Sequence, residues 1–471
     1  MLSPVDSLAP EWLVVPDDPN DLAAAVWPAS ASRGADGALE IAGVSATALA
    51  QTFGTPVLVL DEEEVRVRAR AFRAAFDAAA ADHGTTAQVY YAGKAFLCTA
   101  VARWVIEEGL RIDVCTGGEL EVALAAGVAA DRIGFHGNNK SVPELERAVE
   151  VGVGTIVVDS EIEIERLAAI VARTGARQCV LVRVISGVHA ETHDFLATAH
   201  EDQKFGFPLV DAAAAVARIR EIDGLEFAGL HCHIGSQIFG VAGFRESASR
   251  VLELLEALRE TGPVPQLNLG GGFGIAYTRV DDPTPIETLA GEIVAAVAEG
   301  CAARGIEMPA LSFEPGRAIV GTAGVTLYEV GTIKDVQLGS GAVRRYLSVD
   351  GGMSDNARPA LYGAQFSARL ASRLGIGEAR LSRVVGKHCE TGDIVVEHEY
   401  LPADAAPGDL LAVPATGAYC ASLASNYNHV PRPPIVAVRD GRAQVIVRGE
   451  TIADVLGRDV GIVPASDPVV R

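Results

Sequence analysis

A single lysine ends a run of small, β-branched and aromatic residues in AQVYYAGKAF, residues 87–96. If Lys94 stands at the apolar end of a strand, loss of hydration lowers the pKa of its amine and frees the amine for Schiff-base chemistry with a carbonyl group. A lysine there could instead extend to the protein surface or pair with a carboxylate. The stretch alone favours this second interpretation, so other motifs must decide.

Three consecutive glycines interrupt LNLGGGFGIAY, residues 267–277. The backbone N–H groups of Gly270, Gly271 and Gly272 could approach a phosphate closely, as in barrel phosphate sites, although a tight turn explains the glycines equally well. The spacing does not match the dinucleotide pattern G-x-G-x-x-G, because Ile275 occupies the position of the last glycine.

Two histidines end another strand-like stretch, HCHIGSQIF, residues 231–239. His231 and His233 lie on one face of a strand and could ligate a metal, but no nearby carboxylate or third ligand completes the set, so we expect no metal. We expect one imidazole to pack against a planar group, while the hydroxyl of Ser236 and the backbone of Gly235 reach a phosphate.

An acid and a guanidinium flank a Pro-Gly turn in FEPGR, residues 313–317. Glu314 could hold a heterocyclic nitrogen protonated, and Arg317 could bind phosphate or carboxylate with its planar fork. A surface ion pair would explain the two residues as well.

The four stretches together require one ligand. It needs an aldehyde for Lys94, a phosphate for the glycines, a flat ring for a histidine and a ring nitrogen for Glu314. Pyridoxal 5'-phosphate (PLP) carries all four groups, so we expect it as the cofactor. Its protonated ring accepts the electrons left behind when a bond at the Cα of an amino acid breaks.

The elements that must position these residues alternate regularly from residue 62 to 316, with short β-branched runs followed by helical stretches. Helices are predicted at 142–152 and 244–260, for example. Eight such units are typical of a (β/α)8 barrel, whose chemistry lies at the C-terminal ends of its strands, and Lys94 sits at such an end. The predicted strands are 87–93, 111–116, 132–137, 155–159, 178–185, 226–234, 265–270 and 310–314.

Beyond residue 320, Gly- and Pro-punctuated β-branched runs have no helical partners. We therefore predict an α/β plus β protein, with a PLP-binding barrel over 62–320 and a β-rich domain over 321–471. Residues 1–61 include the strand-like TPVLVL at 55–60 but are too few to bury a core alone, so we assign them to the β-rich domain.

Three stretches of the predicted β-rich domain carry further polar side chains. Each one alone is explained by structure, as a small buried cysteine, a surface arginine or a core tyrosine. Together with the barrel motifs they instead indicate contacts with a substrate. The side chains are Cys389 and Glu390 in GKHCETGD, Arg358 and Tyr362 in SDNARPALYG, and Tyr419 in ATGAYCASLASNYN.

The composition limits the partners. The chain has 39 Lys and Arg against 61 Asp and Glu, and the formal net charge of -22 repels nucleic acid and anionic membrane surfaces. Without a signal-peptide pattern or a run of roughly 18 apolar residues, we expect a cytoplasmic protein. The seven cysteines are scattered, form no C-x-x-C pair and fit neither a disulfide framework nor a zinc site.

The sequence resembles the diaminopimelate decarboxylases, PLP enzymes that form L-lysine, and in particular their actinobacterial members. The resemblance implies a barrel with a C-terminal β domain, as in the alanine-racemase-like fold. The motifs that carry it are YYAGKAF, DVCTGGELEVAL, HGNNKS, THDFLATAHEDQKFGF, HCHIGSQI, LNLGGGFGIAY, FEPGRAIVG, RRYLSVDGGMSDNARPALYG, VVGKHCETGDIV and GAYCASLASNYN.

The resemblance also implies a role for each site residue. Lys94 would bind the aldehyde of PLP, Asp113 would support the lysine and the ring's phenolic oxygen side, and His233 would stack on the ring. Glu314 would pair with the ring nitrogen. Phosphate ligands would be Ser236, Gly270, Gly271, Gly272 and Tyr419. The substrate would contact Arg317, Arg358, Tyr362, Glu390 and Tyr419.

The resemblance implies further that Cys389 protonates the substrate carbon after CO2 leaves. In the family this cysteine and the acid after it come from the neighbouring subunit, so a homodimer with shared active sites is expected.

The distal end of meso-diaminopimelate carries an amine and a carboxylate, and Arg358 with Glu390 matches both. Three alternatives stay open. An ornithine or arginine decarboxylase has only a distal cation to bind, a racemase would need a second base facing Lys94, and a PLP-binding protein without turnover is generally a single barrel.

Overall fold

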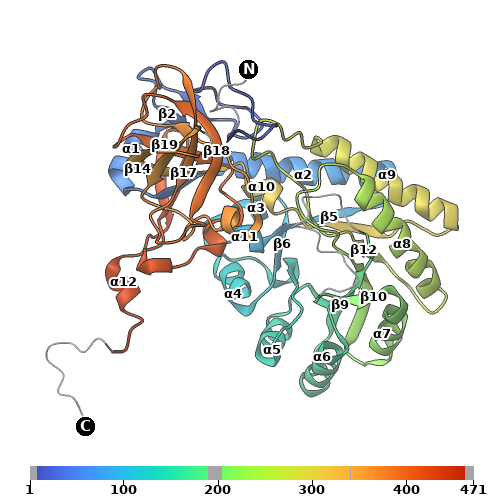
Figure 1. Ribbon diagram of the computed structural model, residues 1–471. Coiled ribbons are helices and arrows are strands. Elements are labelled where there is room, and N and C mark those ends of the chain that lie inside the picture. The colour runs from blue at the N-terminus through green and yellow to red at the C-terminus, as the bar shows by residue number, and fades with distance from the viewer. Residues whose placement is uncertain (1–7, 189–203, 340, 462–471) are drawn as a thin grey trace, which may run out of the picture. The chain divides into compact units, whose positions relative to one another are not determined.

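The structure is a computed structural model that describes residues 8–188, 204–339 and 341–461 (Figure 1). Most of the motif at residues 192–207 lies outside the described residues. The chain forms two compact units, which we call the β-rich unit and the barrel unit. The β-rich unit comprises Met1–Glu62, Tyr277–Val280 and Thr322–Arg471, and the barrel unit comprises Glu63–Ala276 and Asp281–Gly321.

Eight parallel strands close into a ring in the barrel unit, which confirms the predicted fold class. The ring closes because the last strand pairs with the first, with Phe313 opposite Val89. Seven of them fall within the predicted ranges and β11 begins one residue before its range, since short runs buried on both faces are typical of parallel strands. In order around the ring the strands are β5 (Ala87–Ala92), β6 (Arg111–Val114), β7 (Ile133–Phe135), β8 (Thr155–Val158), β9 (Gln178–Ile185), β11 (Leu225–His231), β12 (Gln266–Asn268) and β13 (Ala310–Phe313), and the short β10 (Phe207–Pro208) pairs with β9 outside the ring.

Helices surround the ring of strands (Figure 1). The helices predicted at 142–152 and 244–260 are confirmed as α5 and α8. Among the described residues, no helix combines the length and the apolar character that crossing a membrane requires. The helices are α2 (Glu62–Asp82), α3 (Thr99–Glu107), α4 (Gly117–Ala125), α5 (Val142–Val151), α6 (Glu161–Thr174), α7 (Leu209–Glu221), α8 (Ala242–Arg259), α9 (Ile286–Arg304) and α10 (Arg317–Val320), with short 3-10 helices η2 (Gly93–Ala95) and η3 (Ala130–Arg132).

Aromatic rings hold the seam where the ring of strands closes. The ring of Phe76 on α2 stacks on that of Phe313 on β13, with the centroids 3.7 Å apart. Phe273, just after β12, meets Phe76 edge-on at 5.8 Å and stacks on Phe244 of α8 at 5.3 Å. These contacts connect α2 and α8 to the last two strands, beside the glycine turn.

The β-rich unit is built on one large sheet in which β4 lies between β14 and β20. The strand predicted at 55–60 is confirmed as β4, although it is shifted by one to two residues. Its elements are β1 (Ser32–Arg33), β2 (Leu39–Ile41), β3 (Val44–Ser45), α1 (Ala46–Phe53), β4 (Val57–Asp61), β14 (Gly324–Gln337), β15 (Val343–Val349), α11 (Arg358–Tyr362), β16 (Arg369–Leu370), β17 (Ala379–Val385), β18 (Ile394–Pro402), β19 (Leu410–Pro414), η4 (Ala421–Leu423), η5 (Tyr427–His429), β20 (Ile435–Arg439), β21 (Arg442–Val447) and α12 (Ile452–Leu456).

The N-terminal segment is anchored to the segment around β16. The guanidinium of Arg33 donates to the carbonyl of Leu370 at 2.8 Å and to that of Asn20 at 3.1 Å. The side-chain oxygen of Asn20 in turn accepts from the backbone N–H of Gly375 at 2.7 Å. Residues 20–41 therefore belong structurally to the β-rich unit, although no motif in the sequence marked them.

A buried ion pair connects the loop after β7 to α6 in the barrel unit. The ammonium of Lys140 donates to Glu163 Oε1 at 2.5 Å and to the carbonyls of Gly137 and Val157 at 2.7 and 2.8 Å. The side chains of Lys140 and Glu163 are only 1% and 3% exposed. Because an ammonium has three protons, all of its donors are satisfied.

Removing one partner from this pair should destabilise the barrel. Lys140→Met leaves the carboxylate of Glu163 buried without its cation, so we expect the free energy of unfolding to fall by about 3 kcal/mol. Arg173→Met is the matched control, because the Arg173–Glu146 pair is 60% and 45% exposed and should contribute less than about 1 kcal/mol. Urea unfolding midpoints measure both effects, and equal midpoints would contradict the assignment.

Candidate active site

The predicted residues of the barrel unit gather where the parallel strands end. Lys94 lies in η2, directly after β5, and its positive charge acts on both Asp113 and His233. Burial lowers the pKa of His233 and the charge of Lys94 adds to this, whereas the same charge opposes the burial that raises the pKa of Asp113. The side chain of Lys94 is exposed, whereas its neighbours Gly93 and Ala95 are buried. The prediction that apolar neighbours desolvate the amine is therefore wrong, because the backbone leaves the strand in a 3-10 turn before it reaches Lys94.

Asp113 is a buried carboxylate near the end of β6. It is 1% exposed, and neither of its oxygens has a hydrogen-bond partner among the described residues. Burial raises the pKa of Asp113 to about 6, against the opposing positive charge of His136. A buried carboxylate of this kind is suited to bond a ligand group, because such a bond would relieve the cost of its desolvation.

The glycine turn after β12 is tightly enclosed by backbone. A Cβ at Gly271 would lie 2.1 Å from the carbonyl oxygen of Glu314, and a Cβ at Gly272 would lie 2.6 Å from that of Gly235. Gly270 and Gly272 also have positive φ angles of 71° and 110°. A side chain fits at none of these positions, so the turn presents bare backbone at the strand ends.

The loop after β11 runs beside the glycine turn. Ser236 Oγ accepts a hydrogen bond of 2.8 Å from the guanidinium of Arg317, at the start of α10. The half-buried His233 accepts at Nδ1 from the backbone N–H of Gly271 at 3.2 Å. The structure thus brings Ser236, Arg317, His233 and the glycine turn together, as a phosphate site requires.

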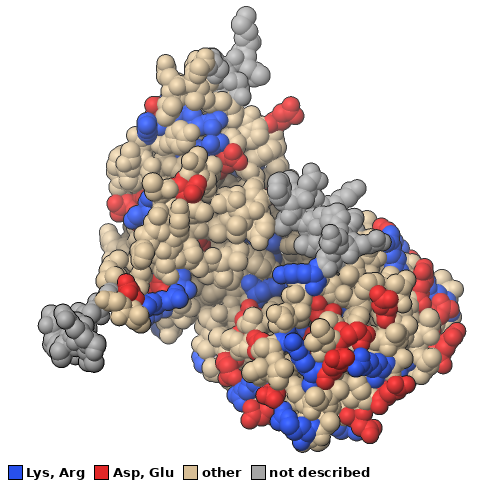
Figure 2. Space-filling model, turned by 60° about the horizontal axis from the view of Figure 1, so that its bottom comes forward, with Lys and Arg blue, Asp and Glu red and all other residues tan. Residues whose placement is uncertain are grey.

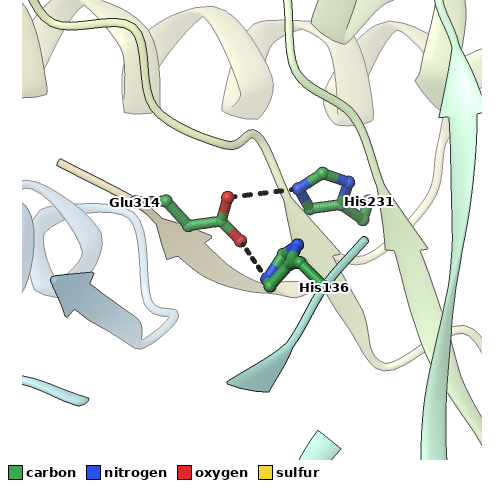
Figure 3. A group of neighbouring side chains, drawn as sticks. All are labelled: His136, His231 and Glu314. Carbon is green, nitrogen blue, oxygen red and sulfur yellow. Dashed lines mark hydrogen bonds and ion pairs between the residues drawn. The ribbon is translucent and has the colours of Figure 1, made fainter. Parts of the chain in front are cut away.

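Glu314 receives hydrogen bonds from two imidazoles (Figure 3). His136 Nε2, just after β7, lies 3.1 Å from Glu314 Oε1, and His231 Nε2, at the end of β11, lies 3.2 Å from Oε2. Burial alone would raise the pKa of Glu314, but the charges and hydrogen bonds of the two histidines hold it well below the usual value. Glu314 is therefore a fixed, ionised acceptor.

Among the described residues, the structure does not group His231 with His233 as a ligand pair, but it does place a carboxylate and a second imidazole beside His231, which the sequence analysis did not expect. His136, His231 and Glu314 each offer one ligand atom, and these atoms lie within 4.8 Å of one another. The set resembles a three-ligand metal site, but the Nε2 atoms of both imidazoles already bond the carboxylate. We interpret the group as a hydrogen-bond network around Glu314.

In the β-rich unit, the guanidinium of Arg358 lies between two tyrosine rings. Its Cζ is 5.1 Å from the ring centroid of Tyr277 and 5.8 Å from that of Tyr419. Arg358 is 3% exposed and forms no ion pair with a carboxylate of the described residues. Tyr419 has a positive φ of 59°, a strained conformation of the kind that clusters at functional sites.

Tyr277 reaches Arg358 because its short segment packs with the β-rich unit. Sequence reasoning placed residues 277–280 in the barrel, but the carbonyl of Tyr277 accepts from Ser367 Oγ at 3.1 Å, and its ring meets that of Phe366 edge-on. No pattern in the sequence indicates that these four residues pack with the β-rich unit and not with the barrel unit.

The other predicted residues of the β-rich unit are exposed. Tyr362 ends α11, and Cys389 and Glu390 lie in the loop between β17 and β18. All seven cysteines are described and free, and Cys389 is the exposed one. An exposed thiol beside an exposed carboxylate is available to a partner molecule.

Comparison with known proteins identifies the family. Residues 62–321 match the family model of the pyridoxal-dependent decarboxylases, pyridoxal binding domain. The chain is 53% identical over 447 residues to a diaminopimelate decarboxylase of Mycobacterium tuberculosis, covering 93% of this chain and 98% of that protein. It is 45% identical to the Bacillus subtilis diaminopimelate decarboxylase, covering 90% and 95%.

A solved structure agrees. The M. jannaschii diaminopimelate decarboxylase in complex with L-lysine superposes with a TM-score of 0.84 at 31% identity, covering 93% of this chain and 98% of that one. The chain belongs to the diaminopimelate decarboxylase family. It is accordingly a pyridoxal-dependent decarboxylase, which confirms the resemblance seen in its motifs.

Sequence analysis missed several residues that contact the predicted ones. His136 follows β7 as Lys94 follows β5, so the rule that barrel chemistry lies at strand ends could have selected it. Asn268 is the last residue of β12, so the same rule could have selected it. Tyr277 and Asp393 carry no such signal, because their contacts depend on loop conformation.

Asp393 fastens the loop of Cys389 to the loop that precedes Arg358. Its Oδ1 accepts from the backbone N–H of Met353 at 2.6 Å, and its Oδ2 accepts from that of His388 at 2.8 Å. His388 Nε2 also lies 2.8 Å from Ser354 Oγ. The carboxylate, 3% exposed, therefore holds two candidate functional segments together.

Asp393→Asn keeps the volume of the side chain but replaces one acceptor oxygen by an –NH2 group. One of the two backbone N–H groups would then lose its acceptor, so the variant should destabilise the β-rich unit. Loss of a buried hydrogen bond to a charged acceptor costs about 2 kcal/mol. The control is Asp440→Asn, since the Asp440 side chain is 88% exposed. Urea unfolding followed by fluorescence should show a lower midpoint for Asp393→Asn alone; matching midpoints would argue against the fastening role.

Proposed function

We propose that the chain removes one carboxyl group from meso-2,6-diaminopimelate to form L-lysine and CO2, the last step of lysine biosynthesis. The observation that supports this substrate most directly is Arg358, a buried guanidinium held by aromatic rings and not by a carboxylate of the described residues. Such a cation is suited to the distal carboxylate of a diamino diacid.

The barrel residues fit PLP by the chemistry of their side chains. The unpartnered oxygens of Asp113 can accept hydrogen bonds from the cofactor. The enclosed glycine turn offers bare backbone for a phosphate, and the ionised Glu314 can pair with a protonated ring nitrogen. When bound, PLP supplies a ring that accepts the electrons released as CO2 leaves the substrate. Lys94, beside Asp113, would bind its aldehyde.

Further residues would orient the cofactor. His233 would contact the face of the ring. The phosphate would be bound by Ser236, Gly270, Gly271, Gly272 and Tyr419, of which Ser236 is itself held by Arg317.

The substrate contacts follow from charge. Arg317, Arg358 and Tyr362 would bind carboxylates, and Glu390 would bind the distal amine. A decarboxylase acting on ornithine would have no use for a buried cation at the distal end, because an unpaired charge there would reject the substrate.

We propose further that the protein is a cytoplasmic homodimer, in which Cys389 and Glu390 complete the partner's site and the thiol protonates the substrate carbon. The exposed Tyr427 lies beside His388 of this loop, and Leu361, Tyr362 and Leu423 of the same unit are also exposed. On the face shown in Figure 2, charged side chains are dense over the barrel unit and sparse over the β-rich unit. A surface poor in charge favours association.

The activity is tested by incubating the purified protein and PLP with meso-diaminopimelate and measuring lysine and CO2. Arg358→Met should lower kcat/KM about a hundredfold or more, because it leaves the distal carboxylate unpaired. Product from ornithine but none from diaminopimelate would favour the related decarboxylases. Bound PLP without turnover of any diamino acid would favour a binding protein.

The shared site is tested with two inactive variants. Cys389→Ala should keep the absorbance of bound PLP and lose most turnover, whereas Lys94→Ala should lose both. Random mixing of the two subunits makes half of the dimers heterodimers with one competent site each, so about a quarter of wild-type activity should return. No recovery in dimers shown by mass spectrometry to be mixed would place Cys389 in its own subunit's site.

A further inference from the structure

Asn268 connects the glycine turn to Glu314. It lies at the end of β12 and is 3% exposed. Its Oδ1 accepts from the backbone N–H of Gly270 at 2.8 Å, and its Nδ2 donates to Glu314 Oε1 at 2.7 Å. The backbone N–H of Glu314 returns to the carbonyl of Gly270 at 2.9 Å. Two hydrogen bonds thus join the two segments, and a third, within the glycine turn, holds the amide of Asn268 in place.

The two imidazoles complete the surroundings of the carboxylate (Figure 3). Glu314 Oε1 accepts from Asn268 and His136, and Oε2 accepts from His231. The rings of His136 and His231 meet edge-on, with centroids 5.0 Å apart. Three donors from three different strands therefore fix both oxygens, which leaves the carboxylate little freedom to rotate.

Other titratable and charged groups near Glu314 also lie at the strand ends. Lys94 follows β5, Asp113 is on β6, Arg183 is on β9 and His233 follows β11. The side-chain hydrogen bonds that orient both oxygens of Glu314 come from Asn268, His136 and His231.

We propose that Asn268, His136 and His231 are positioning residues that hold Glu314 in place for the ring nitrogen of PLP and keep it in register with the glycine turn that receives the phosphate. The inference rests on the proposed function. Neither Asn268 nor the histidine pair needs to touch PLP for this role, because each acts through Glu314.

Asn268→Asp is the sharpest test, because it keeps the shape and the bond to Gly270. It places a carboxylate oxygen where the donor stood, 2.7 Å from Glu314 Oε1. Two carboxylates so close cannot both ionise, so Glu314 would share a proton or turn away. We expect PLP to bind the apoprotein about tenfold to a hundredfold more weakly, with a changed visible absorbance of the bound cofactor.

The histidines offer paired variants. Gln places an amide nitrogen near the position of Nε2 and keeps a donor, whereas Leu removes it. His136→Leu and His231→Leu should weaken PLP binding about tenfold or more, and the corresponding Gln variants should recover most of the affinity. The exposed His83, changed to Leu, is the control.

Dissociation constants are measured by titrating apoprotein with PLP, and melting temperatures and circular dichroism show that each variant is folded. If Asn268→Asp does not fold, the Leu and Gln pairs decide. Wild-type protein that binds no PLP would overturn the proposed function and the inference with it. The inference alone would be overturned if wild-type protein binds PLP and the Asp and Leu variants match its affinity and spectrum. It would also be overturned if the Gln variants recover none of the affinity that the Leu variants lose.

Discussion

Pairing of β13 with β5 is the constraint on which the barrel site depends. Since the strands are parallel, closing the ring brings their C-terminal ends to one rim, where residues as distant in sequence as Asp113 and Glu314 become neighbours. Stacking of Phe76 on Phe313 holds the same seam from outside. An open sheet would instead leave β5 and β13 as unpaired edges and separate the two ends of the site.

Two carboxylates buried at this rim have pKa values shifted in opposite directions. Glu314 and Asp113 are both nearly inaccessible, yet the pKa of Glu314 is lowered while that of Asp113 is raised to about 6. The difference lies in the donors, because Glu314 accepts from Asn268, His136 and His231, and Asp113 has no hydrogen-bond partner among the described residues. The chain itself supplies the hydrogen-bond donors to Glu314, whereas Asp113 is suited to accept hydrogen bonds from a ligand.

The sequence predicted the barrel well because its evidence is local. Each strand is a short apolar run between helical stretches, and the strand-end rule then selects Glu314 and Asp113 without any knowledge of contacts. It did not reveal the exposure of Lys94, which depends on the 3-10 turn of η2, or the two hydrogen bonds of Asn268, which depend on how β12 meets its neighbours. Register and loop conformation are set by packing, which no single stretch reveals.

In the β-rich unit, the surroundings of Arg358 suggest why its partners are aromatic. A carboxylate beside the guanidinium would neutralise it and compete with an anionic ligand. The rings of Tyr277 and Tyr419 attract the cation through their quadrupoles without adding negative charge. The guanidinium is thereby fixed in place, and its charge stays available for the ligand. Tyr419 holds its ring beside Arg358 with a strained backbone, as residues at functional sites do.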